Sequence, residues 1–302
     1  MISKDEVGLP VKAHLDELLH LRYKPKKEAF ANCDPCPAFK FFDWVIWLPD
    51  AAVSFRVLKP KTVLALAHPK SLKLLNLFRC LLKDTILVIA GEDTNLSEVK
   101  ELVSKLRPYC KAIYFEAKDI EMESVKSFSM GFTSYYLNRS SSDSIVQLIG
   151  KVAAPDWKKS GVLAAWGGIW KKLDNQLDDR KSASKFVESS AWITREELDA
   201  EAYWERLAAS EFLIAPAGQG IQAPKLAEAW LMHTVPIVTN NPCFRDLHDL
   251  GYPLLILDRW EDLNEDIIEE FNKNIRPFIN WSEVNYMLTN TFFHKKILEN
   301  SI

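Results

Sequence analysis

The sequence predicts an α/β protein with two doubly wound domains that face a central cleft, and three observations lead to this prediction. The chain has 302 residues, and this length favours two domains because one domain usually takes about 100 to 200 residues. Apolar runs of strand length alternate with segments of helical periodicity. Because the runs are continuous, they indicate strands covered on both faces, as in parallel sheets with crossover helices. The same rhythm starts again after a linker of Ala154, Pro155 and Asp156.

Residues 1–154 are predicted to form the first domain. Its expected strands are apolar runs, at 44–48, 62–67, 85–90 and 111–115. The segments between them with helical periodicity are 72–82 and 96–106. A serine-rich turn at 140–144 precedes a further expected helix at 145–152. This order predicts a parallel sheet with crossover helices.

Residues 155–280 are predicted to form the second domain. Its expected strands are the apolar runs at 162–166, 211–215, 235–239 and 254–257. Its expected helices are the segments near 178–188, 196–209, 224–233 and 263–272. Thr194 and Glu197 have the spacing of a capping box and predict the start of the second of these helices. Residues 281–302 are predicted to form a last helix that crosses back to the first domain.

Composition excludes several classes of protein. With a net charge of -3, the chain lacks the overall basic balance typical of proteins that bind nucleic acid or anionic membranes. No segment approaches the roughly 20 apolar residues of a membrane span, and the first residues lack the apolar core of a signal peptide. We therefore expect a cytoplasmic protein. Cys33 and Cys36 have no second Cys or His pair at zinc spacing, so reduced thiols in a loop are favoured over a metal site.

The most informative segment of the chain is 211–240, whose pattern predicts a strand, a glycine turn, a helix and a second strand. Gly218 and Gly220, which follow Pro216, let main-chain amides approach a ligand, and Pro224 suits the first turn of a helix whose N-terminus favours anions. Lys225 and Glu228 fall on one face of that helix. The segment predicts a site for a diphosphate and a ribose. The alternative is an exposed helical ion pair with no ligand.

Several stretches in and around this segment resemble the nucleotide-sugar site of exostosin-like glycosyltransferases. The matching stretches are 212–220, 225–230 and 235–238, followed by 244–247 and 252–262, and more weakly 129–132. The resemblance spans roughly residues 185 to 270. It implies the GT-B architecture, in which two Rossmann-like domains face a cleft. The first domain then binds the acceptor and the second binds a nucleotide-sugar donor.

The resemblance implies a glycosyltransferase that moves a hexosyl or pentosyl unit from a UDP-sugar to a hydroxyl of a glycan or glycoprotein. It favours inversion of the anomeric centre, although exostosin-like families also include retaining domains. Lys225 and the amides of 218–222 would hold the diphosphate, and Glu228 would accept hydrogen bonds from the ribose. The chain departs from the family pattern at Lys225, where arginine is usual, and at His233, where glycine is usual. These departures keep open a second interpretation, a non-catalytic protein that binds nucleotides or glycans with the same fold.

Three other residues are candidates for binding the donor. Gly167, with Gly168, follows the strand expected to end at Trp166 and predicts a tight turn at the cleft. Arg180 could reach the diphosphate from across the cleft, and Trp192, expected at a strand end, could border the uracil ring. The structural alternatives are a solvated helix face for Arg180 and a core position for Trp192.

The catalytic base is expected at a strand end of the first domain, because transfer needs a group to take the proton of the acceptor hydroxyl. Asp93 and Glu92, directly after the run 85–91, fit best, ahead of Asp50 and His68. Each of these also suits a turn or a helix cap.

The sequence predicts transfer without a metal ion. It contains no Asp-x-Asp motif of the kind that holds a divalent ion in other glycosyltransferases. Lysine and a helix N-terminus would balance the diphosphate instead. We expect no cofactor other than the UDP-sugar, which is a substrate, and no nucleic-acid partner or membrane span. A nicotinamide dehydrogenase is disfavoured because no Gly-x-Gly-x-x-Gly follows an early strand.

Overall fold

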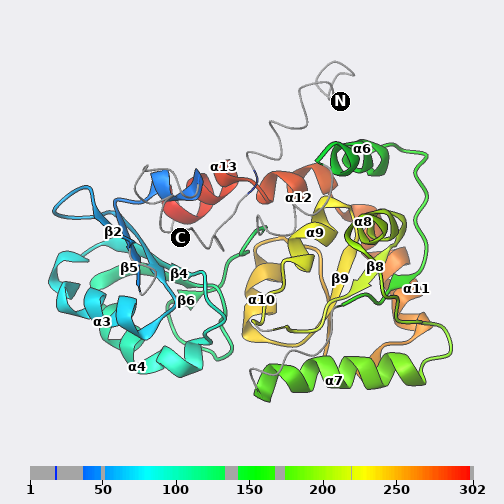
Figure 1. Cartoon of the computed structure of the whole chain (residues 1–302), viewed down its shortest axis with the longest axis horizontal. Helices are drawn as coiled ribbons and strands as arrows, with labels where there is room; N and C mark the ends of the chain where they lie inside the picture. The colour runs from blue at the N-terminus through cyan, green and yellow to red at the C-terminus, as the bar shows by residue number, and fades with distance from the viewer. Residues whose placement is uncertain are drawn as a thin grey trace.

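The structure is a computed structural model that describes residues 18, 37–48, 52–132, 142–166, 174–218 and 220–299. The described part is a mixed α/β protein with two sheets, each flanked by helices (Figure 1). Residues 44–126 contribute the first sheet and residues 162–257 the second. None of its described helices combines the length and the apolarity that crossing a bilayer requires. The division of the chain into domains at residue 154 stays a prediction.

The first sheet has six strands in the order β2-β1-β3-β4-β5-β6. The strands are β1 (Trp44–Trp47), β2 (Ala52–Phe55), β3 (Thr62–Leu66), β4 (Thr85–Ala90), β5 (Cys110–Phe115) and β6 (Val125–Lys126). All neighbours pair in parallel except β1 and β2, which pair antiparallel. The strands expected from the apolar runs are present. The edge strand β2 and the two-residue β6 were not predicted, because neither shows a long apolar run.

Helices α3 (Pro69–Leu77) and α4 (Leu96–Leu106) cover one face of the first sheet. α4 has the predicted bounds because Asn95 and Glu98 form a capping box at its start. α3 ends at Leu77, short of the predicted residue 82, and a 3-10 turn (Arg79–Leu81) follows. Leu72 and Leu75 of α3 and Val99 of α4 pack on the strands. Both crossovers lie on the same face because right-handed connections between successive parallel strands place them there.

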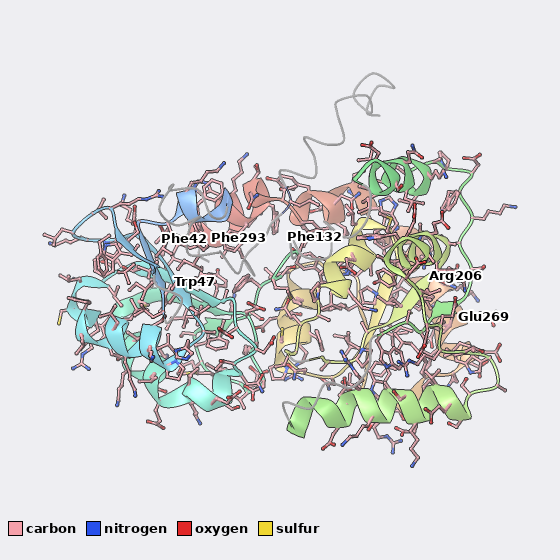
Figure 2. The ribbon with its side chains drawn as sticks, viewed as in Figure 1. Phe42, Trp47, Phe132, Arg206, Glu269 and Phe293 are labelled. Carbon is pink, nitrogen blue, oxygen red and sulfur yellow. The ribbon has the colours of Figure 1, made fainter. Side chains whose placement is uncertain are left out.

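The other face of the first sheet is covered by the C-terminal end of the chain. α12 (Trp281–Met287), α13 (Asn290–Phe292) and a π-helix (Phe293–Glu299) replace the single helix expected there. Phe293 packs on Phe42 with a distance of 6.2 Å between ring centroids, and both belong to the cluster that contains Trp47 (Figure 2). The end of the chain therefore completes the core of the first sheet, since the crossover helices leave this face open.

The second sheet has four parallel strands in the order β10-β9-β8-β7. The strands are β7 (Val162–Leu163), β8 (Phe212–Ile214), β9 (Val235–Thr239) and β10 (Leu255–Leu257). The helices around them are α6 (Ser142–Val152), α7 (Asp174–Ser189), α8 (Ala200–Ala209), α9 (Lys225–Leu231), α10 (Pro242–Asp249) and α11 (Glu265–Asn274). Each expected strand is present, and each is shorter than or equal to its apolar run.

The capping box predicted at Thr194 and Glu197 is wrong. α8 begins at Ala200, and its N-cap is Asp199, whose carboxylate accepts hydrogen bonds from the amides of Glu201 and Ala202. The preceding residues are extended instead, and Arg195 forms a parallel bridge with Ala164. Pairing with the exposed edge of β7 satisfies main-chain groups that a helix start would otherwise have used.

We expect Gly91→Ala to destabilise the protein and Gly150→Ala to stabilise it. Gly91 has φ +92°, and a Cβ atom there would lie 2.4 Å from the buried ring of Trp47. A strained backbone and the overlap together predict a loss of about 2 kcal/mol or more in the free energy of unfolding. Gly150 lies inside α6 with open space around it, so alanine there should add about 0.5 to 1 kcal/mol. Urea denaturation of both variants measures the two effects, and a Gly91→Ala variant as stable as the wild type would contradict the predicted strain.

Candidate functional site

The loop between β8 and α9 is closed by a main-chain hydrogen bond of its own, so the amide of Gly218 is already engaged. The amide of Gly218 donates a hydrogen bond of 3.0 Å to the carbonyl of Gly220, and Pro216 is buried at the end of β8. Pro224 is the N-cap of α9 and already has helical dihedral angles, and Lys225 is the first helical residue. α9 has only seven residues. Its dipole is therefore a weaker source of positive potential than the charged side chains around the loop.

Three cationic side chains converge on this loop, and we call Arg180, Arg195 and Lys225 the cation cluster. Arg180, on α7, places a guanidinium nitrogen 2.8 Å from where a Cβ of Gly218 would stand. Both arginines lie close enough to Lys225 to lower the pKa of its ammonium group. The cluster therefore joins α7, the extended segment before α8 and the start of α9, three parts of the chain that are separate in sequence.

Lys225 and Arg195 are held at the carboxyl end of β7. The ammonium group of Lys225 donates a hydrogen bond to the carbonyl of Ala165 and lies 4.5 Å from the ring centroid of Tyr203. The guanidinium of Arg195 donates a hydrogen bond of 3.0 Å to the carbonyl of Trp166 and lies 5.4 Å from the indole ring. Among the described residues, Nε of Arg195 has no hydrogen-bond partner. This nitrogen is itself buried, so its hydrogen-bonding capacity is not met by the described protein atoms.

Glu228 interacts electrostatically with Lys225, and the residue is only 3% exposed. Burial raises the pKa of Glu228, while Lys225 and a hydrogen bond with Tyr203 lower it. Burial is also the largest cause that lowers the pKa of Lys225, and Glu228 opposes that shift. This placement favours a role for Glu228 in positioning Lys225, and its burial disfavours the direct ribose contact that the resemblance implies.

Asp179 fixes the position of α7 relative to the loops. Its Oδ2 accepts a hydrogen bond of 2.7 Å from the amide of Ala217, and its Oδ1 accepts hydrogen bonds from Thr239 and from the indole of Trp260. Ala217 follows β8, Thr239 is the last residue of β9, and Trp260 follows β10. One carboxylate therefore connects the carboxyl ends of three strands. Because Arg180 is the next residue, the same contacts place its guanidinium beside Gly218.

The carboxyl ends of the two sheets face each other and are in direct contact through Gln222. The side-chain amide of Gln222 donates hydrogen bonds of 2.7 Å to the carbonyls of Glu116 and Phe128, and its oxygen accepts one of 3.1 Å from the amide of Met130. Glu116 follows β5, and Phe128 and Met130 follow β6. The loop that carries Gly218 is therefore attached directly to the first half of the chain.

A second contact lies beside the first. Asp246 on α10 forms an ion pair of 2.9 Å with Lys118 and accepts a hydrogen bond from the amide of Ser127. The hydroxyl of Ser127 lies 3.1 Å from the sulfur of Cys243. The Lys118 side chain is 4% exposed. Lys118 also pairs with Glu121 at 3.1 Å, so the ammonium keeps one partner within the first half of the chain while Asp246 connects it to α10.

The expected catalytic carboxylates lie at this junction on the side of the first sheet. Glu92 and Asp93 form a half-buried bend after β4. The amide of Gly91 donates a hydrogen bond of 2.7 Å to the carboxylate of Glu116, whose carbonyl bonds Gln222. The bend is therefore connected to the Gly218 loop through a single residue, Glu116. The role of Asp93 and Glu92 as base stays a prediction.

The other candidates for the base have different positions. His68 is the N-cap of α3, and its Nδ1 accepts a hydrogen bond of 3.1 Å from the amide of Lys70. This bond favours the structural interpretation, because a capping nitrogen is already occupied. Asp50 lies outside the described residues.

The remaining donor candidates have mixed outcomes. Gly167 and Gly168 lie outside the described residues. Trp192 was expected at the end of a strand, and this position is wrong. It lies in the bend after α7, and because Arg195 pairs in parallel with Ala164, Trp192 precedes the extended segment. Its half-buried ring packs against the core of the second sheet, which favours the structural interpretation.

Sequence reasoning missed Arg195, Tyr203, Asp179 and Gln222. Arg195 was hidden by the mistaken capping box, since a helix start there would have turned it into solvent. In the sequence, Tyr203 looks like an ordinary aromatic residue of an amphipathic helix, and Gln222 looks like an ordinary loop residue. Neither carries a signal of a functional role. Asp179 could have been found from the sequence, because it stands directly before Arg180, which was already a candidate for binding the donor.

In the part of the chain that the structure describes, no three His, Cys, Asp or Glu side chains gather closely enough to hold a metal ion. Metal-independent chemistry stays a prediction.

The contact between Gly218 and Arg180 predicts a coupled effect on anion binding. Gly218→Ala should push the guanidinium away, because the new Cβ meets only the end of that flexible side chain. We expect Gly218→Ala and Arg180→Ala each to weaken pyrophosphate binding by roughly 10- to 100-fold, the range for one charged hydrogen bond. The double variant should bind as weakly as Arg180→Ala alone. Calorimetric titration of the three variants tests this, and losses that simply add would show that the two residues act separately.

Comparisons with known proteins give little further information. No protein-family model and no curated protein sequence matches this chain. Among solved structures, it is similar to the crystal structure of Anabaena Alr3699/HepE in complex with UDP-glucose, with a TM-score of 0.40 and 11% sequence identity. The similarity covers 80% of this chain and 78% of the other. A similarity of this degree establishes neither a family nor a function for the chain, and both depend on its own residues.

Proposed function

We propose that the protein is a glycosyltransferase of GT-B architecture that moves a sugar from a UDP-sugar donor to a hydroxyl of a glycan acceptor. In this proposal the transfer is direct, inverts the anomeric centre and needs no metal ion. The second sheet carries the donor and the first sheet carries the acceptor side. The observation that carries the proposal is the cation cluster on the Gly218 loop, at the junction between the two sheets.

The cation cluster supports a diphosphate as its ligand. Within the cluster, Glu228 interacts with Lys225, while the nearby carboxylate of Asp179 is engaged by three neutral donors. Positive charge that is partly removed from water is unfavourable unless an anion pairs with it. A diphosphate carries the charge and the several oxygens needed to pair with more than one cation. A single carboxylate would use fewer of these donors.

The proposed step begins with the acceptor hydroxyl. Its oxygen attacks the anomeric carbon while its proton passes to a carboxylate of the first sheet, for which we propose Asp93 or Glu92. The bond between the anomeric carbon and the diphosphate oxygen breaks, and its electron pair stays on that oxygen. Negative charge therefore grows on the diphosphate, where Arg180 and Lys225 stabilise it.

One observation supports the alternative, a non-catalytic protein that binds nucleotides or glycans. Gln222 and Asp246 join the two sheets by direct contacts at the junction where an acceptor would have to enter. Turnover of donor separates the two proposals, whereas nucleotide binding alone does not.

We expect Lys225→Ala to weaken UDP binding by roughly 10- to 100-fold, because it removes a charged hydrogen-bond donor. Burial lowers the pKa of Lys225 to about 8, and a bound diphosphate would raise that pKa. Wild-type affinity should therefore be greatest below pH 8 and fall as the pH rises from 8 toward the higher pKa of the complex. Titration of UDP at several values between pH 7 and 9.5 tests this, and the part of the fall that Lys225 causes should be absent from the Lys225→Ala profile. Equal affinity of both proteins at pH 7 would remove the site assignment.

Turnover is tested by measuring UDP release from a panel of UDP-sugars, with and without sugar acceptors. We expect Asp93→Asn or Glu92→Gln to lower kcat by roughly 100-fold or more, the usual contribution of a general base, while UDP affinity stays unchanged. Glu101→Gln, an exposed carboxylate on α4, serves as the matched control. No release of UDP from any donor by the wild type, together with tight UDP binding, would favour the non-catalytic alternative.

A further inference from the structure

The outer edge of the first sheet exposes an unusual concentration of apolar side chains. Nine large hydrophobic residues are exposed in the described part of the chain, and six of them lie between residues 53 and 78. The six are Val53 (41%), Phe55 (49%), Val57 (44%), Leu58 (75%), Leu77 (77%) and Phe78 (38%). We call them the apolar edge. Single exposed apolar residues are ordinary, but a group of them indicates an interaction site.

The apolar edge is continuous across two elements. Phe55 on β2 packs edge-on against Phe78 beyond α3, with 6.0 Å between ring centroids, and against Trp44 at 4.8 Å. The indole of Trp44 donates a hydrogen bond of 2.7 Å to the carbonyl of Val57, which fixes the loop that carries Leu58. β2 is the last strand of the sheet, at the end of the molecule away from the second sheet (Figure 1). The exposed side chains therefore form a fixed surface.

The same segment carries a strong positive charge. Residues 51–83 contain no Asp or Glu, although the whole chain has a net charge of -3. They contain seven basic residues, all exposed, namely Arg56, Lys59, Lys61, Lys70, Lys73, Arg79 and Lys83. Along the sequence, the nearest described acidic residues are Asp84 and Asp43, and the Asp43 carboxylate accepts hydrogen bonds from the amides of Lys61 and Thr62. The overall charge thus conceals a local basic surface.

The combination of charge and apolarity selects among possible partners. A second copy of the chain, docked symmetrically on this edge, would oppose two identical basic surfaces, and that contact is unfavourable. A nucleic acid would match the charge but would leave Leu58 and Leu77 without apolar contacts. An anionic lipid surface matches both features, since aliphatic side chains enter the boundary between headgroups and acyl chains while lysine and arginine meet the headgroups.

We propose that the apolar edge, with its seven basic residues, docks the protein on the surface of an anionic membrane. None of the described helices would cross the bilayer in this arrangement. Binding comes from a few inserted side chains and from charge, so it is reversible and weakens as salt is added. The opposite end of the molecule, which holds the second sheet, would project away from the lipid. This inference goes beyond the proposed sugar transfer and does not depend on it.

The test is flotation of the whole protein with two kinds of vesicle, one of phosphatidylcholine alone and one that also contains about 30% phosphatidylserine. The anionic lipid gives the second kind a negative surface potential. We expect the wild type to float only with the anionic vesicles. Leu58→Gln/Leu77→Gln should reduce the bound fraction at least about tenfold, and Lys59→Gln should reduce it about fivefold. Phe278→Gln is the matched control, because Phe278 is 83% exposed but lies outside the basic segment; it should float like the wild type.

Several outcomes would overturn the proposal. These are the absence of flotation with anionic vesicles, equal flotation of the Leu58→Gln/Leu77→Gln variant, or an equal loss in Phe278→Gln. A dimer in solution that the Leu58→Gln/Leu77→Gln variant abolishes, without any vesicle binding, would instead assign the edge to a second copy. All substituted residues are exposed, so circular dichroism should confirm that the variants remain folded. UDP binding by the same variants should equal that of the wild type, which separates this test from the test of the donor site.

Discussion

The arrangement of the candidate site depends on one buried carboxamide, the side chain of Gln222. It is 1% exposed and pairs with three main-chain groups from the ends of β5 and β6. The carbonyl of Glu116 also accepts a hydrogen bond from the hydroxyl of Ser127, so Gln222 adds to a junction that is already bonded there. A buried main-chain group that loses its last partner costs about 1 to 3 kcal/mol. The contact places the Gly218 loop directly against Glu116, which in turn holds the bend that carries Glu92 and Asp93. A change in how the two sheets meet would therefore alter the position of the loop.

On the second sheet, too, a few side chains position the residues of the candidate site. Asp179 ties α7 to the ends of three strands, and the neighbouring Arg180 is thereby brought to Gly218. Lys225 is placed by the carbonyl of Ala165, the ring of Tyr203 and the buried Glu228. Positive charge is concentrated beside the Gly218 loop, where glycine leaves the main chain without a Cβ atom. This arrangement is favourable for a ligand with several anionic oxygens.

The two ends of the molecule present different surfaces. The junction of the sheets is polar and closely bonded, whereas the outer edge at β2 combines apolar side chains with a basic segment. The net charge of -3 hides the basic segment, because the excess of acidic over basic residues in the rest of the chain exceeds the seven positive charges of the segment. The composition argument against an anionic membrane concerns the chain as a whole and does not address this segment, where basic charge and exposure coincide.

The sequence by itself determined the periodic elements, because a strand buried on both faces must be a continuous apolar run and a capped helix carries its signal locally. The bounds of α4 and the strand, glycine turn, helix and strand of 211–240 follow from such local rules. Only the tertiary structure decided which side chains meet. Arg195 reaches the site because its segment pairs with the edge of β7, Trp192 lies away from a strand end for the same reason, and Gln222 is a hydrogen-bonding partner of the first sheet. These contacts join residues 30 to more than 100 positions apart, and no local pattern encodes a pairing that depends on how two finished sheets pack.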